Sequence, residues 1–394
     1  MMFPCVLGEL ITDSYAHYVF AEDTKVLWTA PAKGETLVLP GENTPCHCRS
    51  PFSGKLKGAF NVPFSLLLPE AAELAGNAGA LMRYRLPCSY SPRFSVVTIT
   101  YRIFTVVTHN SLLKPNHTVG SQVSYTAKTK PEFPSVPRQL AYQEHSPLIG
   151  PDGDPDGWLT LPPIKIQGTA FSSRPVEVTY TLSLAKPLSY TRGSAIPLHL
   201  SVDCDDVQAL DLLSSPHAPM IRLMRTISLG YDVGGGYLSS RKLDLARAKS
   251  LNLITFKDLT ERVQTGGWWP LPAYDRTSTA RRELQGEIHL PPTIGATAHL
   301  GRYDYYYEVA VYPPELAGFS SSRSGRLQSV PVDICTLYTN GPRPIAYSPP
   351  KYSDIVRVQE EPATRYNTFS AGKLIYYWNK DLRELTYSYL IVYP

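Results

Sequence analysis

Apolar and polar side chains alternate strictly through much of this chain, and this period of two limits the folds available to it. In residues 176–184, VEVTYTLSL, every second residue is apolar, and Glu, Thr and Ser stand between. The pattern returns in residues 196–204, IPLHLSVDC, and in residues 303–311, YDYYYEVAV. Such strands are typical of antiparallel sheets with one face on a core and one in water. The residues expected to point inward are Val176, Val178, Tyr180, Leu182, Leu184, Ile196, Leu198, Leu200, Val202, Cys204, Tyr303, Tyr305, Tyr307, Val309 and Val311.

The same period appears in residues 60–66, 95–107 and 221–229. The chain is also rich in proline (36) and tyrosine (26), which favours short strands joined by proline-bearing loops over helices. Two sheets that face each other through their apolar sides form a sandwich. The 394 residues suffice for two domains. We therefore predict an all-β protein of two consecutive antiparallel β-sandwich domains.

The alternation breaks at two internal places. Residues 131–163 contain eight prolines and the cluster GPDGDPDG, which indicates a linker. Residues 231–284 are irregular, and within them residues 243–264 favour a short helix. The predicted organisation is a short N-terminal sandwich (1–130), a linker (131–163), a C-terminal sandwich (164–340) with an insertion at about 231–284, and a tail (341–394).

Charge and cysteine content restrict the expected partners and compartment. The net charge is only +4, and no run of five basic residues occurs, so we do not expect nucleic acid as a partner. The sequence shows neither a signal-peptide pattern nor a run of eighteen apolar residues that would span a membrane. Six cysteines in 394 residues suit a reducing compartment. These features predict a cytoplasmic protein.

No motif of metal binding or catalysis stands out. Cys46, His47 and Cys48 form a CHC triplet, but a closed zinc site needs four ligands and no second pair stands at ligand spacing. The sequence lacks the dinucleotide, P-loop, nucleophile-elbow and HExxH signatures. His199 falls at an outward strand position, and we expect it and His289 to be surface residues. We therefore predict no enzyme activity, no cofactor and no metal.

One short motif does suggest a partner. Pro349, Pro350 and Tyr352, in YSPPKYSD, match P-P-x-Y, the peptide that WW domains bind. A proline pair favours the polyproline II conformation before binding, so docking costs little chain entropy. Chance alone gives roughly 0.2 matches in a chain of this composition, so the motif by itself is weak evidence. The alternative interpretation is a stiff spacer.

Three stretches resemble the α-arrestin branch of the arrestin family: residues 54–69 with 80–86, which carry a Pro-Phe-Ser strand and an LP turn, and residues 176–202, which carry a Tyr-x-x-Gly turn before an Ile-Pro strand. The resemblance covers most of residues 50–345 and implies the arrestin fold. Only about fifty residues precede the Pro-Phe-Ser strand, so the first sandwich is expected to be short, with outer strands missing or degenerate and a sheet edge exposed.

The resemblance implies an adaptor without enzyme activity. Such a protein binds the cytosolic tail of a membrane transporter or receptor, and its P-P-x-Y motif recruits a WW-domain ubiquitin ligase of the HECT type. The cargo is then ubiquitinated and internalised, and the adaptor is recruited peripherally to the plasma membrane or endosomes. Pro349, Pro350 and Tyr352 would be the docking residues. Arg281 and Arg282 are a basic pair that acidic cargo or anionic lipid would attract, although such pairs are usually solvated surface.

Other functions remain open. The main alternative is a ligase-independent arrestin-like sorting or signalling scaffold, in which the tail motif is idle. A lectin or adhesion sandwich, a hydrolase and a truncated product without a folded first domain are less favoured. The aromatic residues 372–394 fit an added strand, a partner-binding segment or a gene-model artefact.

Overall fold

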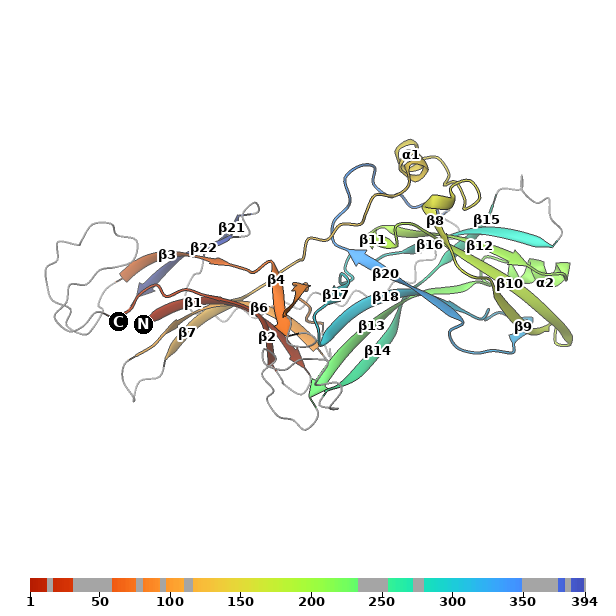
Figure 1. Cartoon of the computed structure of the whole chain (residues 1–394). Coiled ribbons are helices and arrows are strands. Elements are labelled where there is room, and N and C mark those ends of the chain that lie inside the picture. Colours follow the sequence, from red (N-terminus) through yellow and green to blue (C-terminus); the bar gives the residue numbers. More distant parts are fainter. Residues whose placement is uncertain are drawn as a thin grey trace. The chain divides into compact units, whose positions relative to one another are not determined.

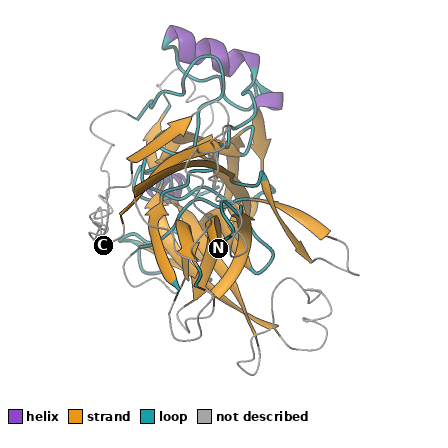
Figure 2. Cartoon of the chain, turned by 90° about the vertical axis from the view of Figure 1, so that its left-hand side faces the viewer, coloured by secondary structure: helices purple, strands orange, loops and turns teal. Residues whose placement is uncertain are grey.

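The computed structural model confirms the all-β prediction, and strands predominate in both views (Figures 1 and 2). The structure describes residues 1–12, 17–30, 59–75, 81–92, 97–109, 116–232, 254–271, 280–348, 375–379 and 384–392. No helix within these ranges is long and apolar enough to cross a membrane.

The chain divides into two compact units. The first comprises residues 1–125, 232–254 and 361–394, and the second comprises residues 126–231 and 255–360. The first unit contains β1 (Met2–Thr12), β2 (His17–Thr24), β3 (Ala59–Leu67), β4 (Ala71–Ala75), β5 (Leu81–Arg85), β6 (Val97–Val107), β7 (His117–Val123), β21 (Ile375–Asn379) and β22 (Glu384–Val392).

The first unit has two layers around an apolar cluster. One sheet has the strand order β2-β1-β6-β7, another has the order β21-β22-β3, and β4 pairs with β5. Val6 of β1 and Ile103 of β6 pack against Phe64 and Leu66 of β3, and all four side chains are buried. Strands from both layers therefore share one core, as a sandwich requires.

The C-terminal strand β22 belongs to the first unit, although the sequence placed it in a tail. It pairs antiparallel with β3 along its whole length, from Glu384 opposite Leu67 to Val392 opposite Ala59 (Figure 1). We expected a sheet edge of the first sandwich to be exposed, but one edge of β3 is covered by a strand from the other end of the chain. Pairing satisfies backbone N–H and C=O groups that an open edge would leave free. Of the three interpretations of residues 372–394, the structure has the added strand.

The second unit is a larger sandwich. Its elements are α1 (Val136–Glu144), η2 (Pro155–Gly157), β8 (Trp158–Thr160), β9 (Ile164–Ala170), β10 (Arg174–Ala185), β11 (Ser189–Thr191), β12 (Ala195–Asp203), α2 (Val207–Leu213), β13 (Met220–Asp232), β14 (Ile254–Thr265), β15 (Gly267–Pro270), β16 (Arg281–His289), β17 (Ala298–His299), β18 (Tyr303–Tyr312), β19 (Phe319–Ser321) and β20 (Gln328–Cys335).

Two sheets make this sandwich. One has the order β15-β16-β12-β10-β9-β19, with β8 on β10, and the other has the order β11-β20-β18-β13-β14, with β17 on β18. All fifteen residues that the alternation predicted to point inward are buried. The pattern found these residues because consecutive side chains of a strand must point to opposite faces.

Residues 131–163 are not a linker. They belong to the second unit and form α1, η2 and β8. The helix α1 lies on the outer side of the sheet that contains β12 and β16 (Figures 1 and 2). Proline does not prevent this helix, because Pro137 stands in its first turn, where no intrahelical N–H bond is lost.

The prediction of an irregular insertion at 231–284 is also wrong for the part of this range that the structure describes. Residues 254–265 form the strand β14 instead of a helix and extend the sheet of β13, whereas β15 and β16 belong to the other sheet, beside β12. These residues form a strand because the edge of β13 supplies backbone hydrogen-bond partners. Helix propensity is a local property and does not include such partners. The remainder of residues 243–264 lies outside the described residues.

Candidate functional site

The predicted docking residues Pro349, Pro350 and Tyr352 lie outside the residues that the structure describes. The described chain reaches Ser348, the residue directly before Pro349. From residue 336 to Ser348 the chain forms neither helix nor strand. The contacts of its last described residues therefore define the point on the second unit from which the proline motif starts.

The carboxylate of Glu287 holds this point. Glu287 lies in β16 and is only 1% exposed. The N–H of Tyr347 donates to Oε1 at 2.7 Å, and the N–H of Ser348 donates to Oε2 at 3.1 Å. Hydrogen bonds to an ionised acceptor are roughly twice as strong as neutral ones. We call the Glu287 carboxylate and these two amides the Glu287 anchor.

Sequence reasoning missed Glu287 because the strand pattern places it on the outer face. Its neighbours Gly286 and Ile288 are buried, and alternation turns Glu287 away from the core between them. It is buried nevertheless, because Tyr347 lies against the sheet at this position. A carboxylate in such a place requires hydrogen-bond donors, and the two amides supply them. No local signal in the sequence GEIHL could have indicated this covering segment.

Stacked tyrosine rings add to the anchor. The rings of Tyr347 and Tyr142, the latter in α1, have centroids 6.4 Å apart and planes inclined by 27°. Burial raises the pKa of both phenols to about 12, so both are neutral at physiological pH. The Tyr347 hydroxyl has no hydrogen-bond partner among the described residues. An unpartnered buried hydroxyl costs about 1–3 kcal/mol, which reduces the net stability of the anchored segment.

His289 and Ser348 form the outer part of the same cluster. The Nε2 atom of His289 lies 3.0 Å from Ser348 Oγ and 3.3 Å from Glu287 Oε2. The His289 side chain is 32% exposed, whereas the carboxylate beside it is almost fully enclosed. The hydroxyl of Ser348 therefore lies beside a solvent-accessible imidazole and a buried anion. His289 is partly exposed, as expected of a surface residue, and it also contacts Ser348 and Glu287.

Arg138 fixes α1 over this site. Its guanidinium donates to the backbone carbonyls of Lys186 and Gly157, and its Cζ lies 5.1 Å from the centroid of the Trp158 ring. The residue is 4% exposed, and burial lowers the pKa of the guanidinium from its usual value. These contacts join the helix to β8 and to the end of β10. The surface on which Tyr347 packs is thus held by a second, independent set of bonds.

The expectation that His199 is exposed is wrong. Its strand position is outward, as the alternation indicates, but it is buried under the layer formed by residues 131–163. Its ring lies edge-on to Trp158 at a centroid distance of 6.3 Å, and its Nε2 lies 3.6 Å from Glu283 Oε2. Burial is the main reason that the pKa of His199 is lowered from its usual 6.5. His199 therefore belongs to the packed surface beneath α1.

A small space remains between these side chains. It has a volume of about 10 Å³ and is bordered by Trp158, His199, Trp269, Glu287 and Tyr347, among others. That volume is close to the minimum that one water molecule needs. It is far below the several hundred Å³ of a typical small-molecule site. The contacts described in this region hold the segment that ends at Ser348.

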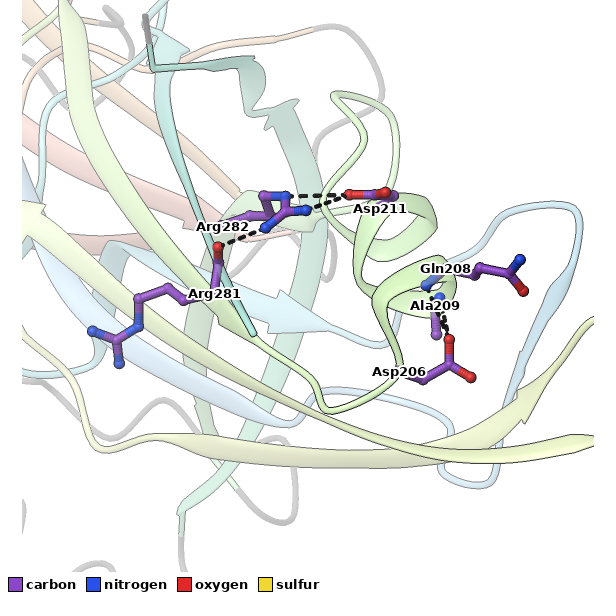
Figure 3. Close-up of polar contacts among 6 residues, drawn as sticks. All are labelled: Asp206, Gln208, Ala209, Asp211, Arg281 and Arg282. Atoms are coloured by element: carbon purple, nitrogen blue, oxygen red, sulfur yellow. Dashed lines mark hydrogen bonds and ion pairs between the residues drawn. The ribbon is translucent and has the colours of Figure 1, made fainter. Parts of the chain in front are cut away.

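Arg281 and Arg282 are both engaged in ion pairs, and Figure 3 shows that of Arg282 with Asp211. Arg281 Nε lies 2.6 Å from Asp203 Oδ1, and Arg282 Nη2 lies 2.9 Å from Asp211 Oδ1. Asp206 caps α2 by accepting the N–H groups of Gln208 and Ala209 (Figure 3). Each arginine already has an acidic partner, which weakens the attraction of this pair for acidic cargo or anionic lipid.

Within the described ranges, no group of three or more His, Cys, Asp or Glu side chains is arranged to hold a metal ion. Cys46, His47 and Cys48 lie outside those ranges.

Comparison with known proteins does not identify the chain: no family model matches it, and no curated protein matches it significantly. The resemblance to α-arrestins accordingly remains an expectation from the sequence.

Proposed function

We propose that this protein is an adaptor that links membrane cargo to a WW-domain ubiquitin ligase of the HECT type, and that Pro349, Pro350 and Tyr352 are its ligase dock. Cargo would be the cytosolic tail of a transporter or receptor. Ubiquitination of that cargo would direct its endocytic sorting. The protein would act in the cytoplasm and be recruited peripherally to plasma membrane or endosomes.

The observation that carries this proposal is the position of the Glu287 anchor. The anchor holds the chain as far as Ser348, and the proline pair follows directly. A WW ligand must present two prolines and a tyrosine from an extended segment. A fixed starting point beside such a segment limits the volume that a bound ligase can sample, which raises its effective concentration near cargo held by the same chain.

The two-sandwich organisation is compatible with this role, since β-sandwiches commonly serve as binding scaffolds. Fold alone does not determine function, so the motif and its anchor carry the proposal. The space beside the anchor does not favour a small-molecule function.

The test is binding of the full chain, and of a peptide spanning residues 343–358, to a panel of isolated WW domains. Tyr352→Ala removes the aromatic side chain that fills the second pocket, and we expect affinity to fall about 30-fold or more, as for an interface hot spot. Lys351→Ala is the matched control, because the motif accepts any residue at that position. Failure of the wild-type peptide to bind any WW domain would reject the ligase dock and favour a ligase-independent scaffold.

A further inference from the structure

We propose that Ser348 is a phosphorylation site, and that its modification releases the segment before the proline motif from Glu287. The effect on the Glu287 anchor is a property of the second unit alone. Only its consequence for WW-domain binding rests on the proposed function.

The sequence makes Ser348 a substrate for a defined class of enzyme. Pro349 follows it, and one class of protein kinase selects serine directly before proline. In the reaction, Ser348 Oγ forms a bond to the γ-phosphorus of ATP, the bond to the β,γ-bridging oxygen breaks, ADP leaves, and the kinase base takes the hydroxyl proton. Serine–proline pairs also occur at Ser50, Ser91, Ser146 and Ser215, so the serine–proline motif alone does not single out Ser348 as the modified residue. The surroundings of Ser348 carry the argument.

Those surroundings cannot hold a second anion. A phosphate on Ser348 adds a charge of about −1.5 to −2 at neutral pH. The N–H of the same residue is bonded to the carboxylate of Glu287, which is 1% exposed and has little water to screen it. Like charges this close in a partly buried site repel strongly. The backbone of Glu287 stays in place, because its strand β16 is paired with β12 on one side and β15 on the other.

The cations nearby do not offset this repulsion. His289 lies 3.0 Å from Ser348 Oγ, but a protonated imidazole supplies one positive charge against the carboxylate and the phosphate together. Arg138, whose charge acts on the Tyr347 phenol, is already bonded to two carbonyls and stacked on Trp158. The phosphorylated segment therefore gains by leaving Glu287 for water.

The anchor is also weak enough to open. The Tyr347 hydroxyl is unpartnered among the described residues, and the anchored segment forms no strand. The kinase acts on the released segment, and the phosphate then prevents its return. The segment exists in an anchored and a released state, and phosphorylation destabilises the anchored state more than the released one. It therefore shifts the existing equilibrium toward release.

The test is hydrogen exchange of the Tyr347 and Ser348 amides in the full chain, with matched variants. Ser348→Glu adds a negative charge, and Ser348→Gln adds the same bulk without charge. We expect both amides to exchange about tenfold faster or more in Ser348→Glu than in Ser348→Gln. Wild-type chain treated with ATP and a proline-directed kinase should show the same acceleration, and Ser348→Ala treated alike should not.

Equal exchange in the Glu and Gln variants would overturn the proposal. Slower exchange after phosphorylation would overturn it too, since it would mean that His289 binds the phosphate and tightens the segment. A kinase that modifies the peptide 343–358 but leaves Ser348 in the full chain unmodified would show that the anchor does not open. The exchange readout involves no WW domain, so it stays interpretable if the ligase dock fails its own test.

Discussion

Replacement of Glu287 by glutamine isolates the contribution of its charge to the anchor. The variant keeps the size of the side chain and one carbonyl oxygen, but it replaces the second oxygen with an NH₂ group. That NH₂ group faces the N–H of Tyr347 or Ser348, and two donors cannot form a hydrogen bond with each other. The carboxylate accepts two bonds, and each bond to a charged group is worth about 1.5–3 kcal/mol.

Glu287→Gln removes one of these bonds outright and makes the other neutral, so we expect a loss of about 1.5–3 kcal/mol from the anchor. The loss cannot exceed the stability of the anchor itself, because a detached segment hydrogen-bonds to water. Since 1.4 kcal/mol corresponds to a factor of ten, amide exchange at Tyr347 and Ser348 should accelerate about 10- to 100-fold.

Hydrogen exchange followed by mass spectrometry, resolved to single amides by fragmentation, measures this directly. Glu283→Gln is the matched control, because Glu283 lies on the same face of β16 and contacts His199 rather than the segment. It should leave exchange at Tyr347 and Ser348 unchanged. If Glu287→Gln leaves those amides as protected as in the wild type, the carboxylate does not hold the segment, and the reasoning from the anchor to the motif fails.

Two further predictions concern the packing that supports the site. A Cβ on Gly286 would lie 2.4 Å from Trp268 Cε3, so Gly286→Ala should lower the free energy of unfolding by about 1–3 kcal/mol in denaturant titrations. Gly150→Ala is the control, because its Cβ would lie 3.8 Å from His199 Cδ2, and it should change the free energy of unfolding by less than about 0.5 kcal/mol. The lowered pKa of His199 means that the unfolded chain binds its proton at a higher pH than the folded chain, so stability should fall as pH drops below about 6.5. His199→Gln should show a smaller loss between pH 7.5 and 5.5 if this histidine contributes; equal losses in both proteins would exclude it.

The sequence predicted the strands and their core faces well, and the reason is local. Alternation with period two is imposed by strand geometry, so Tyr180 and Tyr307 could be assigned to the core without knowledge of their neighbours. Predictions from the sequence failed where a segment packs against or pairs with residues that are distant in the sequence. Residues 131–163 contain proline and glycine, as linkers do, yet they fold onto an outer sheet face. Strand β22 pairs with β3 across more than three hundred residues, which no local pattern indicates.

The candidate site divides in the same way. Sequence alone determined its motif, since Pro349, Pro350 and Tyr352 are defined by residue type and spacing. Tertiary structure alone decided that Glu287 and His199, both outward by alternation, are buried. Alternation specifies which way a side chain points, but burial depends on what covers that face. Here the covering segments are α1 and residues 341–348, and their position is set by contacts such as those of Arg138 and Tyr347 that form only once the sandwich has folded.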